Sequence, residues 1–142
     1  MMQPEDSPAR AERPPNPLEI LLKALLGSGE VHVVIKNGTA TAELRGRARL
    51  RRSVEWLTIE FDDGPSHAHL RRGGLAKAEF LTGSAKNRGV RFLDAGLDPA
   101  ITCYVPATCR AREPFSAERL AKFDKLEVAN RNASWRQEPP VS

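Results

Sequence analysis

Hydrophobic positions near the start of the chain recur with the period of an α-helix. In NPLEILLKALLGSG (residues 16–29), leucines stand three and four residues apart, at Leu18, Leu21, Leu22, Leu25 and Leu26. Asn16 is a good N-cap, Pro17 suits the first helical position, and Glu19 completes a capping box. Gly27 follows the last leucine and is a helix stop. We therefore predict an amphipathic helix that lies on an apolar surface.

From residue 30 the period changes to two, which is typical of β-strands. EVHVVIKNGTATAELRG (30–46) predicts a hairpin, with Asn37-Gly38 as a type I′ turn. Val31, Val33 and Ile35 fall on one face, and an inward row continues on the second strand at Ala40, Ala42 and Leu44.

The later segments continue the strand pattern. SVEWLTIEF (53–61) alternates Leu57, Ile59 and Phe61 with polar or aromatic positions, and short strands follow at 66–71, 76–83, 90–95 and 100–107. A last helix is predicted in residues 115–132, with Ser116 as its N-cap and with Leu120, Phe123 and Leu126 on one face. The fold class is therefore α+β: a curled antiparallel sheet with an N-terminal amphipathic helix and a C-terminal helix packed on it.

Length and composition predict one domain. The chain has 142 residues, of which 40% are hydrophobic and 28% charged, as in ordinary globular proteins. We expect a disordered leader at 1–15, a single domain at 16–130 and a flexible tail at 131–142. The sequence has no apolar run long enough to cross a bilayer and no secretory signal. Cys103 and Cys109 do not suggest a disulfide framework, so a reduced, cytoplasmic setting is expected.

The net charge of +4 suggests an anionic partner. Arginines gather in LRGRARLRRS (44–53) and in HLRRGG (69–74). Because these stretches lack aromatic residues for stacking on bases, nucleic acid is disfavoured. The arginines remain compatible with an anionic small ligand, with an acidic protein partner, or with a solvated loop and strand edge.

Two of the three histidines stand in GPSHAHLRRGG (64–74), separated by one alanine. In a strand, His67, His69 and Arg71 project from the same face. Neighbouring imidazoles can bind a transition metal or offer an axial nitrogen to haem iron. The alternative is a pair of half-exposed polar residues on a sheet surface.

The familiar enzyme motifs do not fit. A cupin needs a glutamate soon after the histidine pair, where Arg71, Arg72, Gly73 and Gly74 stand, and a binuclear phosphoesterase needs aspartate at Arg71. The cysteines lack zinc-site spacing. The chain also lacks a G-x-S-x-G elbow, a Walker A loop and a dinucleotide fingerprint. Tyr104, the only tyrosine, is another candidate, since a phenol can ligate ferric iron, although such rings more often pack.

The order of the segments resembles the bacterial haem-utilisation family typified by HemS, ChuX and HutX, in its single-module form. The resemblance rests on GEVHVVIKNGTATAELRG, EWLTIEFDDGPSHAHLRRGGLAKAEFLTG and VRFLDAGLDPAITCYVPA, and covers residues 18–127. It is diffuse, and two segments depart from the family pattern: GSAKNRGV, and AITCYVPA, which lacks phenylalanines.

The resemblance implies a haem-binding or haem-trafficking protein, often a homodimer, that exchanges haem with donor or acceptor proteins. It implies His69 or His67 as the axial ligand and Arg71 and Arg72 as partners of the propionates. Some members take part in haem breakdown, which needs an external electron donor, and the sequence shows no site for one. The alternative is a non-catalytic interaction module with the same fold that does not bind haem.

Overall fold

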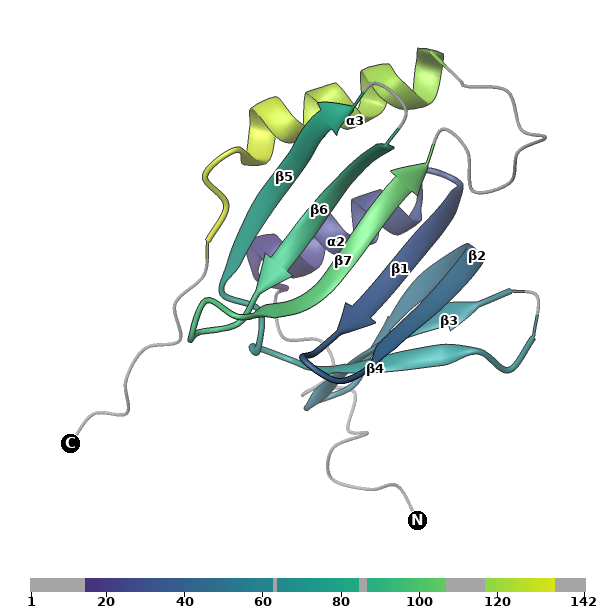
Figure 1. The fold of residues 1–142 in the computed structure, drawn as a ribbon, viewed down its shortest axis with the longest axis vertical. Helices are drawn as coiled ribbons and strands as arrows, with labels where there is room; N and C mark the ends of the chain where they lie inside the picture. The colour runs from purple at the N-terminus through teal and green to yellow at the C-terminus, as the bar shows by residue number, and fades with distance from the viewer. Residues whose placement is uncertain (1–14, 63, 85–86, 107–116, 135–142) are drawn as a thin grey trace.

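The computed structural model describes residues 15–62, 64–84, 87–106 and 117–134, and these residues form one antiparallel sheet and two helices (Figure 1). In chain order the elements are α2 (Pro17–Leu26), β1 (Glu30–Lys36), β2 (Thr41–Arg52), β3 (Trp56–Phe61), β4 (His67–Arg71), β5 (Lys77–Ser84), β6 (Asn87–Leu93), β7 (Pro99–Pro106) and α3 (Ala117–Asn130). The seven strands lie in the order β4-β3-β2-β1-β7-β6-β5, so β4 and β5 are the edges. The predicted α+β class and the two helices are confirmed. Leader residues 1–14, tail residues 135–142, Ser116 and Cys109 lie outside the described residues.

Helix α2 begins as the sequence predicts, with one difference. The Asn16 side chain accepts hydrogen bonds from the backbone N–H groups of Leu18 and Glu19, at 2.9 and 3.0 Å. Glu19 does not complete a capping box, because its carboxylate binds the guanidinium of Arg72 instead. Glu19 therefore connects α2 to the loop after β4 instead of capping the helix.

The β1–β2 hairpin forms, but its turn is not the predicted type I′. Lys36 pairs with Thr41, which leaves a four-residue connection from Asn37 to Ala40. A type I′ turn needs positive φ at both central residues, and neither Asn37 nor Gly38 has it. The Asn37 side chain instead accepts from the N–H groups of Thr39 and Ala40, each at 2.8 Å.

Strand β2 is longer than predicted and joins the two parts of the sheet. Its first half pairs with β1 and its second half, from Ala48 onward, pairs with β3. The change of partner falls next to Gly46, which has a φ of 136° that only glycine adopts easily. The sheet can therefore bend at Gly46. The arginine-rich segment 44–53 lies largely in this central strand and not in a loop.

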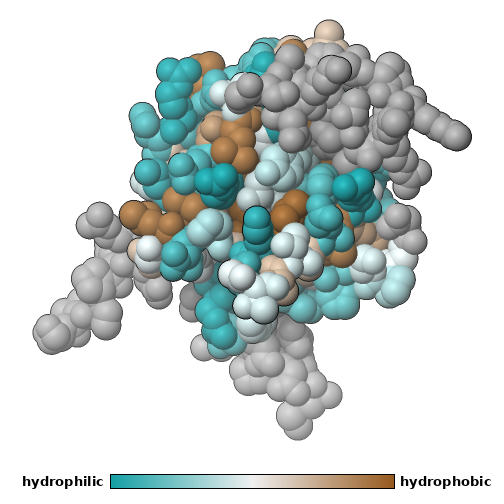
Figure 2. All heavy atoms as spheres, in the orientation of Figure 1, coloured by the Kyte–Doolittle hydropathy of each residue, from teal (hydrophilic) through white to brown (hydrophobic). Residues whose placement is uncertain are grey.

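The two faces of the sheet differ in role. Both helices lie on one side, here the inner face, and the opposite side is the outer face (Figure 1). The core on the inner face includes Leu22 and Leu25 of α2, Val33 of β1, Ile59 of β3, Phe92 of β6, Cys103 of β7 and Phe123 of α3. Seen from the side opposite the helices, hydrophobic atoms lie in separate patches among hydrophilic ones (Figure 2).

Candidate functional site: the outer face of β2, β3 and β4

His67 and His69 project together from the outer face of edge strand β4. Both are exposed, and their ring centroids lie 4.8 Å apart. His67 donates from Nδ1 to the carbonyl oxygen of Pro65 at 2.7 Å, which leaves its Nε2 as the nitrogen with a lone pair. The Nδ1 of His69 lies 2.9 Å from the hydroxyl oxygen of Thr58 on β3. Such contacts orient an imidazole whose other nitrogen can bind a metal.

An aromatic ring and an arginine extend this histidine pair. Trp56 begins β3, is 37% exposed and meets His69 edge-on, with centroids 6.2 Å apart. The guanidinium of Arg71 lies over the Trp56 ring, 4.9 Å from its centroid. The site therefore combines two imidazoles with a partly exposed indole ring and a positive charge that lies over that ring.

Two further arginines approach from β2. Glu60 stands opposite His67, and its carboxylate binds Arg49 at 3.2 Å and Arg51 at 2.9 Å. We name the set Trp56, Glu60, His67, His69, Arg49, Arg51 and Arg71 the histidine face. Its three arginines outnumber its single carboxylate, so it favours an anionic ligand.

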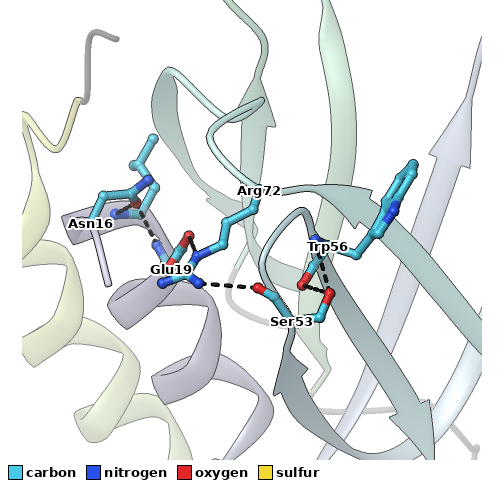
Figure 3. A network of polar contacts seen from close by, with 6 residues as sticks. Asn16, Glu19, Ser53, Trp56 and Arg72 are labelled. Atoms are coloured by element: carbon cyan, nitrogen blue, oxygen red, sulfur yellow. Dashed lines mark hydrogen bonds and ion pairs between the residues drawn. The ribbon is translucent and has the colours of Figure 1, made fainter. Parts of the chain in front are cut away.

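Arg72 lies elsewhere. Its guanidinium binds the Glu19 carboxylate at 3.1 Å and the carbonyl oxygen of Ser53 at 3.1 Å, and both side chains of the ion pair are nearly buried. Figure 3 shows this contact on the α2 side, with the Trp56 ring pointing away from it. Arg71 and Arg72 are neighbours in sequence, but their side chains lie on opposite sides of the sheet.

Tyr104 is also separate from the histidine face. It lies on β7 beside His32 of β1, with ring centroids 5.7 Å apart, and its ring passes over Gly89, where an added Cβ would come within 2.8 Å of it. His32 itself contacts the Glu43 carboxylate at 3.0 Å. Four strand spacings separate β7 from β4, roughly 19 Å along the sheet. The structure thus brings His67, His69 and Arg71 together and places Arg72 and Tyr104 apart from them.

The sequence did not predict that β2 and β3 contribute side chains to the histidine face. Arg45, Arg47, Arg49 and Arg51 alternate with small or apolar residues, which is a strand pattern, but the segment was interpreted as a loop and strand edge. The neighbours of the histidines depend on the β3–β4 register, which pairs Thr58 with His69 and Glu60 with His67. Within the described part of the chain, His, Cys, Asp and Glu side chains form no group of three or more that could hold a metal ion.

Among known proteins, only solved structures match this chain, and they identify its fold. No protein-family model matches the chain, and no curated protein does. Two solved structures of ChuX superpose on 80% of this chain and 72% of their own, with TM-scores of 0.64 and 0.62 at 8% identity. The chain has the ChuX fold.

Two other solved structures also match the fold of this chain. A protein of Agrobacterium tumefaciens matches 79% of this chain and 66% of its own at 21% identity, with a TM-score of 0.63. A protein of Erwinia carotovora matches at 11% identity over 79% of this chain and 70% of its own, also at 0.63. ChuX is described as a haem-binding protein. Among the helices described for this chain, none is long and apolar enough to span a membrane.

Proposed function

We propose that this chain is a cytoplasmic haem-binding and haem-trafficking protein that holds haem on the histidine face. The observation that carries the proposal is the pair of oriented, same-face imidazoles beside Trp56 and Arg71, in a chain with the ChuX fold. Imidazole nitrogen is a common axial ligand of haem iron. His69 or His67 would supply it, and the bound iron would remain on the macrocycle during transfer to an acceptor protein.

The surrounding residues fit the rest of the group. The part of the Trp56 ring that is exposed beside Arg71 offers apolar surface to a porphyrin, and guanidinium groups pair well with propionate carboxylates. Arg71, which lies on the same strand face as the histidines, is placed for this role. Arg49 and Arg51 lie on β2, level with His67 and His69 across β3. The proposal does not depend on Arg72, whose guanidinium is engaged with Glu19.

The histidine face is open, and this supports a dimer. A haem lying on it would keep one side in water, and β4 is an edge strand, so no described strand of this chain pairs with its outer side. A second copy of the chain covering this face would shield the porphyrin. We therefore include a homodimer, with residues 16–130 as the folded domain of each protomer, in the proposal.

A hemin titration followed by absorbance tests the proposal. We expect a saturable, red-shifted Soret band at one hemin per chain. Arg71→Glu, which replaces a propionate partner with a repelling charge, should weaken hemin binding about tenfold. Lys36→Glu, the same charge change on an exposed residue of β1, is the matched control and should leave the affinity unchanged. A titration with no saturable shift, or equal losses in both variants, would contradict the proposal.

A second function is favoured by the arginines of β2. Arg45, Arg47, Arg49 and Arg51 share the outer face, since residues two apart in a strand point the same way. Such a stripe suits an acidic protein segment without any haem.

A glutamate-rich peptide should then bind at low salt and be released at high salt, and Arg47→Glu with Arg49→Glu should abolish binding. Peptide binding that survives both changes would eliminate this alternative.

A further inference from the structure

A groove lies between α2 and α3, on the inner side of the sheet and so on the opposite side from the histidine face. Its volume is about 430 Å³, within the range of small-molecule pockets. The residues that line it are Ala24, Leu25, Gly27, Ser28, Val105, Arg119, Lys122, Phe123, Lys125, Leu126 and Ala129. No part of the function proposed above uses it.

The groove exists because small residues face each other across it. Ala24, Gly27 and Ser28 line the α2 side and Ala129 lines the α3 side, so at these positions the side chains are too small to fill the space between the helices. Leu25 and Phe123 below them are fully or almost fully buried in the core. These two residues form the packed base of the groove, and the apolar surface that a ligand can touch comes from the less buried Ala24, Leu126 and Ala129.

Among the described residues that line the groove, the charged side chains are all positive. Arg119, Lys122 and Lys125 line it, and none of its lining residues is acidic. Lys122 is largely exposed and its one ion pair, with Glu118 at 3.5 Å, is an exposed contact within α3. Lys125 forms no ion pair with any residue that the structure describes. An anionic group at the groove mouth would therefore meet at least two ammonium groups.

We propose that this groove binds a long-chain carboxylate, with its hydrocarbon chain against Ala24, Leu126 and Ala129 and its carboxylate at Lys122 and Lys125. An apolar lining with cations on one rim matches an amphiphile that has one charged end. The described lining residues include no His, Cys, Tyr, Met, Asp or Glu, so they offer no side chain of the kinds that ligate haem iron. The groove is thus chemically distinct from the histidine face.

Calorimetric titration of the full chain with decanoate, below its micellar concentration, tests the proposal. We expect saturable binding at one decanoate per chain, and no saturable binding of decyltrimethylammonium, which has the same chain with the opposite charge. Lys122→Glu combined with Lys125→Glu should weaken decanoate binding about tenfold or more. Lys36→Glu, on the far side of the sheet, should leave it unchanged.

A second variant tests the location independently of charge. Ala129→Trp places a large ring in the groove from an exposed helix position and should weaken decanoate binding about tenfold or more, because the ring occupies the space of the chain. Ala121→Trp makes the same change on α3 outside the groove and is the matched control. Backbone NMR shifts on decanoate addition should centre on Ala24, Gly27 and Ala129.

Three results would overturn the proposal. The first is equal binding of decanoate and decyltrimethylammonium, which would indicate apolar adsorption alone. The second is decanoate binding that neither Ala129→Trp nor the double lysine variant weakens. The third is absence of decanoate binding while an acidic amphipathic peptide shifts the same NMR signals, which would assign the groove to a protein partner.

Discussion

Replacing Arg72 with alanine is expected to lower the free energy of unfolding by about 3–5 kcal/mol, because the change leaves a buried carboxylate without its counter-charge. Glu19 is 3% exposed, and among the residues that the structure describes Arg72 alone forms an ion pair with its carboxylate. The same guanidinium also donates to the carbonyl of Ser53, so the loop before β3 loses a contact as well. Urea unfolding followed by circular dichroism measures the change.

Arg71→Ala is the matched control for this prediction. Arg71 precedes Arg72 in sequence but is exposed on the outer face, where it lies over Trp56. Its loss should cost about 1 kcal/mol or less. Equal destabilisation by the two variants would show that the Glu19–Arg72 pair is not the buried contact described above.

Removing both charges together separates the ion pair from simple loss of packing. Glu19→Leu combined with Arg72→Met keeps apolar volume and leaves no buried charge. This double variant should be more stable than Arg72→Ala alone. A double variant that is less stable than the single one would mean that the carboxylate is stabilised by groups other than Arg72.

Phe123→Ala is expected to lower the free energy of unfolding by about 3–5 kcal/mol, through lost burial and the cavity left behind. Phe123 is 2% exposed, is the buried residue of α3, and meets Phe80 of β5 edge-on with centroids 5.7 Å apart. We expect α3 to detach first, since its attachment to the sheet depends mainly on this ring. Amide hydrogen exchange across residues 117–130 should accelerate more than exchange in β1.

The control for Phe123 lies on the same helix. Val128 is 70% exposed, and Val128→Ala should change the free energy of unfolding by about 0.5 kcal/mol or less. If exchange in α3 were unchanged in Phe123→Ala, other contacts, such as the ion pair of Arg88 with Asp124 at 2.6 Å, would hold the helix instead.

Local patterns were sufficient to predict most of the fold. The leucine spacing of α2 and the alternation in β1 and β3 correspond to the buried positions of those elements. The extent of β2 was missed because long charged side chains hid a period of two, in which Leu44, Ala48 and Leu50 face inward between outward arginines. The turn after β1 was mispredicted because Asn37 uses its side chain to close a wider loop.

The candidate site was predictable only in part. That His67, His69 and Arg71 share a face follows from strand geometry alone. Arg72 follows the last residue of β4, and its partner Glu19 is 53 residues away, so no local pattern indicates the contact. The separation of Tyr104 from the histidines likewise depends on strand order, which places three strands between β4 and β7.

Axial ligation by the β4 histidines is the central claim, and the spectrum of the hemin complex tests it most directly. His67→Ala combined with His69→Ala should remove the Soret band of a histidine-ligated complex, whereas His32→Ala, which removes the third histidine, should leave the band unchanged. Tyr104→Phe should also leave it unchanged, because Tyr104 lies on β7. An unaltered Soret band in the double histidine variant, or its loss in Tyr104→Phe or His32→Ala, would contradict the assignment of haem to the histidine face.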